Sequence, residues 1–230
     1  MPTPKALSTS PVTADHDKGR KATDLFRHAY NGVGLDDDHA QHLNQNPEFP
    51  DKLDKLIREC SAIPPPAFSE LKSFQVTVRK GYKQEGYLDS LRLMKSGELY
   101  YWSPEYNDKN YPDPSHQLVA GKTYLAKLIA INRMVTSAEC LAEYRKHKAY
   151  LTGAQGGAYV WEHYRDELPR NRWTVSFDEE ARLWKDAVGH RRVPRVNRHD
   201  GGDCGLLLGY FGYPWGGNNV LLLLCDLPSA

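Results

Sequence analysis

The spacing of hydrophobic residues in the last third of the chain is typical of short β-strands. Glycine- and asparagine-rich segments separate the strand candidates, as expected for the turns of hairpins. We therefore predict an antiparallel sheet over residues 172–227, in which Pro194 places its strand at a sheet edge or at a bulge. The four strand candidates are residues 173–177, 191–196, 205–211 and 220–227.

The middle of the chain mixes strand and helix patterns. Apolar and polar residues alternate over 73–79, which predicts a half-buried strand. Residues 87–95 have the pattern of a short helix that ends before Gly97. Residues 122–135 fit both a helix and a buried strand by their spacing. Their β-branched and aromatic content favours the strand, which is our prediction.

Two further helices are predicted after this segment. Thr136 and Glu139 have the spacing of a capping box, which satisfies free amides at the start of a helix. A helix to about residue 151 and a second over 154–168 would form a helical hairpin over 137–168. The pair has helix-turn-helix proportions, but acidic residues on its second helix would repel DNA phosphates. A hairpin packed on the sheet is the better interpretation.

The beginning of the chain has a different composition. Residues 1–21 are rich in proline, serine, threonine and charge, which predicts a flexible tail. Short helical patterns broken by glycine and proline fill 22–62, and the prolines at 64–66 mark a boundary. We predict an α+β domain over 63–230. The fold class is α+β: a helical N-terminal segment, a central strand and helical hairpin, and a C-terminal antiparallel sheet.

Composition narrows the class of protein. The 230 residues carry 30 Lys and Arg against 29 Asp and Glu, so the chain lacks the positive excess of a protein that coats DNA or anionic lipid. The longest apolar run, residues 220–225, is far shorter than a membrane span. No apolar signal segment opens the chain, and its four cysteines are scattered. We expect a cytoplasmic protein with reduced thiols and no membrane partner.

Two segments have the residue types of a binding surface. In the strand predicted near residue 195, alternation would send Arg191 and Arg195 to one face and Arg192 and Arg198 to the other. Arginine side chains on an edge strand are suited to phosphates or to another protein. The second segment is an aromatic loop whose rings could stack on a ligand or instead cover the core. Its candidate binding residues are Tyr100, Tyr101, Trp102 and Tyr106.

Histidines and cysteines offer an alternative in the same third of the chain. His190, His199, Cys204 and Cys225 have ligand types for zinc, but their spacing matches no tight ligand pair, so we predict no metal site. Cys204 with His199 or His190 has the residue types of a thiol nucleophile and its base. A glycine-rich hairpin turn explains the same residues, 199–204, without any catalytic role. No phosphate-binding loop or dinucleotide motif is present in the sequence, and we predict no cofactor.

The order of several stretches resembles that of another group of proteins. Val76-Thr-Val-Arg-Lys-Gly81, the helix pair of 136–168, Asp186-Ala-Val-Gly189 and Tyr213-Pro-Trp215 resemble the corresponding parts of a group of small uncharacterised bacterial proteins known as hypothetical sequences. The resemblance covers roughly residues 35–227. It implies the same α+β order of elements and no particular activity.

These observations favour a non-enzymatic binding or interaction module. Its partner would be another protein or a nucleic acid, contacted through the arginine strand and the aromatic loop. The alternative is a hydrolase or transferase that uses the Cys204 site.

Overall fold

The computed structural model describes residues 46–49, 51–52, 55–56, 65–95, 99–200 and 203–228. The tail predicted at 1–21 and most of the helical segment predicted at 22–62 lie outside these residues. The chain divides into two units, Met1–Pro64 and Pro65–Ala230, and the fold described below is that of the second unit.

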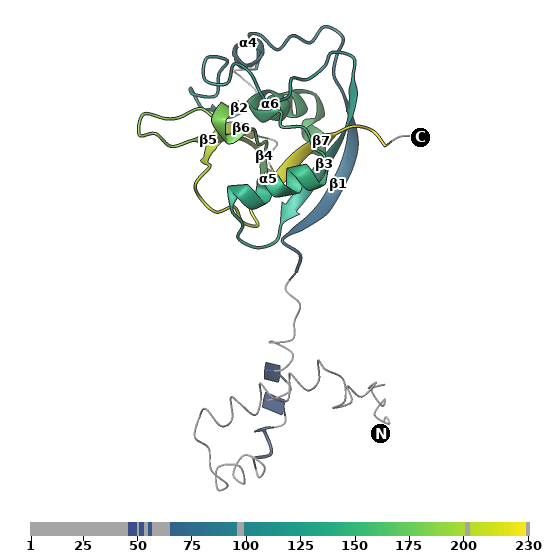
Figure 1. Ribbon diagram of the computed structural model, residues 1–230, viewed down its shortest axis with the longest axis vertical. Helices are drawn as coiled ribbons and strands as arrows, with labels where there is room; N and C mark the ends of the chain where they lie inside the picture. Colours follow the sequence, from purple (N-terminus) through teal and green to yellow (C-terminus); the bar gives the residue numbers. More distant parts are fainter. Residues whose placement is uncertain are drawn as a thin grey trace. The chain divides into compact units, whose positions relative to one another are not determined.

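The strands of this unit form a seven-stranded sheet in the order β1-β3-β7-β4-β5-β6-β2 (Figure 1). The edges of the sheet are therefore β1 on one side and β2 on the other. The strands are β1 Phe68–Thr77, β2 Leu99–Trp102, β3 Thr123–Ile131, β4 Trp173–Val175, β5 Arg192–Arg198, β6 Cys204–Tyr210 and β7 Asn219–Cys225.

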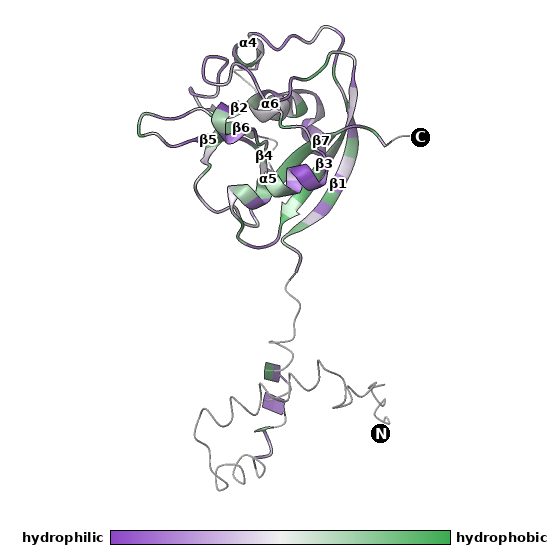
Figure 2. Ribbon diagram, in the orientation of Figure 1, coloured by the Kyte–Doolittle hydropathy of each residue, from purple (hydrophilic) through white to green (hydrophobic). Residues whose placement is uncertain are grey.

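The sheet is mixed, so the prediction of a purely antiparallel C-terminal sheet is only partly confirmed. The β5–β6 hairpin is antiparallel as predicted. However, β7 does not pair with β6: it lies between β3 and β4 and runs parallel to β4. The reason is that residues 220–225 of β7 are all buried, which requires cover on both faces and a position inside the sheet. Figure 2 shows β3 and β7 as the most hydrophobic strands.

Helices cover both faces of the sheet. On one face α6 packs on Leu222 and Leu224 of β7, and on the other α5 packs on Leu221 and Leu223. We call these the α6 face and the α5 face. The helices are α4 Tyr87–Met94, α5 Ser137–Lys146 and α6 Gly153–Tyr164, with 3-10 turns η1 Arg165–Glu167 and η2 Glu180–Arg182.

Both predicted helices of the central region are confirmed, but the helical hairpin is wrong. The Thr136 side chain accepts a hydrogen bond from the Glu139 amide, and the Glu139 carboxylate accepts one from the Thr136 amide, as the capping box predicts. The two helices then separate onto opposite faces of the sheet. Apolar residues of α6, including Trp161, belong to one core, and Tyr144 of α5 belongs to the other.

Strand β3 confirms the strand prediction for 122–135, and β1 is longer than predicted. Sequence alternation indicates a strand from residue 73, whereas β1 begins at Phe68. A bulge lies between Glu70 and Lys72, so Leu71 is an extra residue with no counterpart on β3. Because a bulge inserts one residue into the period of two, the first half of β1 does not continue the alternation of the second half.

Strand β5 lies inside the sheet between β4 and β6, which corrects the prediction that it is an edge strand. Hydrogen bonds from His199 N to Asp203 O and from Phe211 N to Arg191 O show that odd-numbered residues of β5 bond to β6. The nitrogen of Pro194 therefore faces β4. Only the amide of Ser176, just after β4 ends, bonds to the Pro194 carbonyl there. An interior strand accepts this proline because its missing N–H falls where the neighbouring strand stops.

Candidate binding surfaces

The arginines of β5 and its start alternate between the two faces of the sheet, as predicted. Arg191 and Arg195 lie on the α5 face, beside Val193 of the α5-face core. Arg192 and Arg198 lie on the α6 face, which Val196 of the same strand also faces. The register with β6 is regular over this stretch, so the period of two is unbroken.

Three of the four arginines are occupied by carboxylates of the chain itself. Each ion pair joins β5 or its start to a loop or turn outside the strand, so these three arginines stabilise the fold. The pairs are Arg191 with Glu180 at 3.1 Å, Arg192 with Asp186 at 2.6 Å, and Arg198 with Asp166 at 2.7 Å.

Arg195 differs from the other three. Its guanidinium lies over the Trp173 ring, 4.1 Å from the ring centroid. The side chain is partly buried, and its Nε is buried without a hydrogen-bond partner. Within the described residues, no carboxylate pairs with it. Burial lowers the pKa of Arg195, because removing the guanidinium from water disfavours its charged form.

Polar and aromatic side chains follow Arg195 along the same face of the sheet and contact one another. The Asn197 amide lies 2.8 Å from His199 Nε2, and the Tyr100 hydroxyl lies 3.4 Å from Asn197 Oδ1. The Tyr100 and His199 rings are 5.2 Å apart. Tyr100 approaches the sheet closely because Gly205 lies beneath it: a Cβ there would be 2.9 Å from the ring. We call the surface formed by Tyr100, Trp173, Arg195, Asn197 and His199 the Arg195 surface.

The predicted aromatic loop is an edge strand followed by a buried turn. Tyr106 is 0% exposed and donates a hydrogen bond to the Ala154 carbonyl, so its prediction as a binding residue is wrong. Trp102 packs edge-on against Trp161 and donates to the Tyr106 carbonyl, which makes it part of the same core. The exposed rings of the segment are Tyr100 and Tyr101, at 52% and 45%.

A cleft of about 430 Å³ lies beside Leu207 and Leu208 of β6, just beyond the point where the pairing with β2 ends. Glu105 accepts a hydrogen bond from the Ser103 hydroxyl at 2.7 Å, which is the main reason that its pKa lies below the ordinary value. Arg192 is held between Asp186 and the Tyr210 ring, 3.6 Å from the ring centroid. We call this hollow the β6-edge cleft. It is lined by Tyr101, Ser103, Glu105, Trp184, Asp186, Ala187, Arg192, Leu207 and Leu208.

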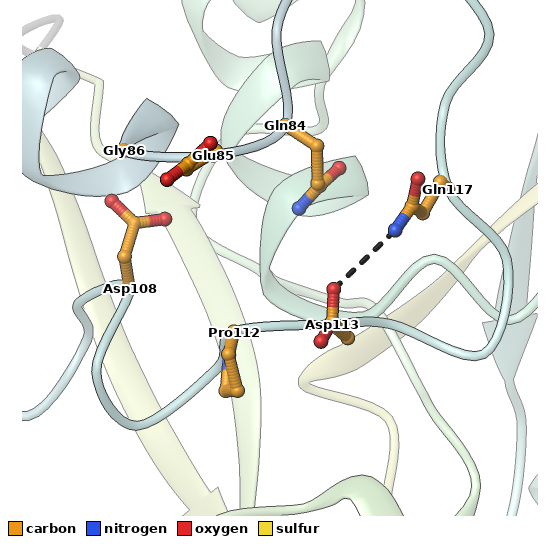
Figure 3. A pocket seen from close by; sticks show the side chains of 7 residues that line it. All are labelled: Gln84, Glu85, Gly86, Asp108, Pro112, Asp113 and Gln117. Carbon is orange, nitrogen blue, oxygen red and sulfur yellow. Dashed lines mark hydrogen bonds between the residues drawn. The ribbon is translucent and has the colours of Figure 1, made fainter.

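Another hollow, of about 450 Å³, lies at the start of α4 and is lined by acidic and amide side chains (Figure 3). Gly86 gives α4 no side-chain cap, and the Asp108 carboxylate instead accepts the Asp89 amide at 2.8 Å. Gln117 donates to Asp113 at 3.3 Å. Burial raises the pKa of Asp108. The carboxylate that reaches the helix thus has a structural task, since it replaces the missing cap.

The residues of the alternative Cys204 site do not come together. Cys204 is 1% exposed and lies in the α6-face core, whereas His199 lies on the α5 face. His190 is beside Asp186, with 3.7 Å between its Nδ1 and the carboxylate. Cys225 is buried in the α5-face core. In the part of the chain that the structure describes, no three His, Cys, Asp or Glu side chains are grouped closely enough to hold a metal ion.

Sequence reasoning did not identify Trp173 and Asn197 of the Arg195 surface, or Ser103 and Glu105 of the cleft. Trp173 begins a predicted strand, and its place opposite Asn197 follows only from the β4–β5 pairing. Ser103 and Glu105 lie within the aromatic segment, between Trp102 and Tyr106, so their place in it is the only sequence signal for them.

Comparisons with known proteins add no assignment. No protein family, curated protein or solved structure shows significant similarity to this chain. Among the described helices, none is both long and apolar enough to cross a membrane. The proposals that follow therefore rest on the Arg195 surface and the β6-edge cleft.

Proposed function

We propose that this protein is a binding module that holds an anionic group of a partner protein at Arg195, beside the exposed ring of Tyr100. The observation that carries the proposal is the partly buried guanidinium of Arg195, which makes no ion pair within the described residues while the other three arginines of the strand do.

The energetics of burial support a ligand at this position. A guanidinium removed from water without a counter-ion is costly, and a carboxylate that completes the pair would recover part of that cost. The Trp173 ring supports the side chain from below, so the planar donors of Arg195 are already oriented. An oriented guanidinium binds a carboxylate through two parallel hydrogen bonds and loses little side-chain entropy in doing so.

The surroundings favour a protein over a nucleic acid. Binding to a nucleic-acid backbone needs a row of cations that follows the phosphates. On β5 the other three guanidinium groups are neutralised by Glu180, Asp186 and Asp166. One free guanidinium beside a tyrosine, an asparagine and a histidine is better suited to a single carboxylate next to an apolar or aromatic side chain.

Arg195→Gln tests the proposal, with Arg191→Gln, directly before β5 and on the same face, as the matched control. The probe is a fluorescein-labelled peptide that alternates glutamate and phenylalanine, titrated against the full chain by fluorescence anisotropy. We expect Arg195→Gln to weaken binding by about tenfold, the effect of losing one charge-assisted contact, and Arg191→Gln to leave it unchanged.

Two results would overturn the proposal. Equal affinity of the wild type and Arg195→Gln would remove Arg195 from the binding site. A labelled thymidine oligonucleotide that binds more tightly than the peptide, with affinity that falls steeply as salt rises, would assign the surface to nucleic acid instead.

A further inference from the structure

The outer edge of β6 is only half covered by β2. The parallel pairing of the two strands ends at Trp102 and Leu206. One more hydrogen bond follows, from the Ser103 amide to the Leu206 carbonyl, and the chain then turns away from the sheet. Residues 207–210 of β6 continue beyond this point, paired only with β5.

The direction of the Leu208 peptide groups follows from the β5–β6 hydrogen bonds. His199 bonds to Asp203 and Arg191 to Phe211, so odd-numbered residues of the regular ladder are the bonded ones. Leu208 lies opposite Pro194 in a non-bonded pair, and its N–H and C=O therefore point away from β5. Within the described residues no hydrogen bond takes up either group. The Tyr210 amide points the same way.

Side chains around this bare edge form the β6-edge cleft. Leu208 and Trp184 supply apolar surface, and both are only partly buried. Arg192 is neutralised by Asp186, whereas Glu105 makes no ion pair in the described part of the chain. The cleft therefore combines unpaired main-chain groups, an apolar wall and a net negative charge, because the single cation Arg192 faces two carboxylates, Asp186 and Glu105.

We infer that an extended peptide segment of a partner protein, carrying a lysine or arginine next to apolar residues, binds as an added strand along Leu207–Tyr210. Its main chain would bond to the Leu208 peptide groups, and its cationic side chain would pair with Glu105. This mode of recognition gives affinity through the main chain and specificity through alternate side chains. It involves residues other than the Arg195 surface and does not depend on the proposed function.

The charge of the cleft argues against a second copy of this chain as the occupant. A two-fold symmetric pairing of two β6 edges would bring two copies of the β6-edge cleft, each with one Glu105 carboxylate, into the same short interface over Leu207–Tyr210. Like charges gathered in one interface oppose association. A peptide with a cationic side chain turns the same carboxylate into an attraction.

Amide exchange of the full chain, followed by NMR, tests the inference. The probe is an N-acetylated, C-amidated hexapeptide that alternates valine and lysine, and its matched control alternates valine and glutamate. We expect the lysine peptide to slow exchange of the Leu208 and Tyr210 amides by about tenfold or more, while the glutamate peptide has no effect.

Two variants separate main-chain pairing from charge. Leu208→Pro removes the outward N–H but no bond to β5, and it should abolish peptide binding. Glu105→Gln should weaken binding by about threefold to fivefold, the size of an exposed ion pair, and Glu179→Gln at an exposed site elsewhere should not. If Leu208→Pro fails to fold, Glu105→Gln and the glutamate peptide still decide the question. Arg195→Gln should leave binding of the lysine peptide intact, so this inference and the proposed function can fail separately.

The inference is overturned if the lysine peptide leaves the Leu208 and Tyr210 amides unprotected at millimolar concentration, or if folded Leu208→Pro binds it as tightly as the wild type. Protection of Leu208 that grows with protein concentration in the absence of peptide would also overturn it. That result would assign the edge to a second copy of the chain.

Discussion

The two edges of the sheet differ in how their outward peptide groups are satisfied. Thr77 near the end of β1 and Leu208 in β6 both have peptide groups that point outward from the sheet. At Thr77 the amide donates to the Tyr164 hydroxyl at 2.8 Å, and the carbonyl accepts from the Tyr159 hydroxyl at 3.1 Å. At Leu208 no described side chain forms a hydrogen bond with the outward N–H or C=O group.

The β1 edge carries further features that discourage pairing with another chain. Leu71 forms a bulge, Lys72 pairs with Glu167, and Lys127 of β3 pairs with Glu70 at 3.1 Å. Bulges and charged side chains are common means of keeping an edge strand from adding a neighbour. The half of β6 beyond Leu206 has no bulge in its pairing with β5. The comparison indicates that the β1 edge is closed by side chains of the protein, whereas among the described residues nothing closes the outer half of β6.

Proline substitutions in β6 give the sharpest contrast. Leu207→Pro removes an N–H that bonds to β5, so we expect it to lower the free energy of unfolding by about 3 kcal/mol or more. Leu208→Pro, one residue on, removes an outward N–H and part of a leucine side chain that packs at the margin of the α6-face core, and it should cost about 1–2 kcal/mol. Urea denaturation of both variants measures the difference. Equal losses would mean that the outward direction assigned to Leu208 is incorrect.

The tyrosine closure of the β1 edge is tested by removing hydroxyls. Tyr159→Phe leaves the Thr77 carbonyl and the Arg79 amide, which bonds to the same hydroxyl at 2.8 Å, without that partner. We expect a loss of about 1–3 kcal/mol in the free energy of unfolding. Tyr164→Phe at the more exposed position should cost about 1 kcal/mol or less. Exchange of the Thr77 amide should become faster in Tyr164→Phe, and an unchanged rate would refute the closure.

Much of the local structure was predictable from the sequence, because it follows from short-range spacing. The capping box of Thr136 and Glu139 fixes the start of α5, and the alternation of Arg191, Arg192, Arg195 and Arg198 fixes their faces. A bulge hid the first half of β1, since Leu71 breaks the period of two.

The order of the strands was not predictable by the same means. Whether β5 is an edge depends on where β7 inserts, and that depends on burial along both faces of a strand distant in sequence. Prediction of the candidate site from the sequence was limited for the same reason. Nothing in the sequence near Arg195 shows that Glu180, Asp186 and Asp166 reach the other three arginines and not this one. Asp166 is 32 residues from Arg198, and even the nearer Glu180 and Asp186 reach their arginines only through the path of the loop before β5, so these pairs require the fold.

Deletion of Leu71 should open the first half of the β1 edge, while the tyrosine closure at Thr77 remains. The bulge would disappear, while Glu70 and Lys72 could keep Ile129 and Leu128 as their partners. Leu71 is 48% exposed, so little core surface is lost. We expect a folded protein that dimerises weakly, at high micromolar to millimolar concentration, through a straightened β1 edge. Sedimentation velocity over a concentration series measures this association, and a strictly monomeric deletion variant would show that the bulge is not what protects the edge.

The smallest effect concerns pH at the open edge. Because Ser103 lowers the pKa of Glu105 in the folded protein, ionised Glu105 contributes stability that is present above its unfolded pKa and lost as the pH falls through the folded value. The side chain is partly exposed to solvent, so this contribution is at most about a few tenths of a kcal/mol. Affinity for the lysine peptide should stay constant from about pH 7 to 5 and decrease below the ordinary glutamate pKa of about 4.3. Glu105→Gln should remove that decrease, and a variant that keeps the full pH dependence would show that another group at this edge holds the cation.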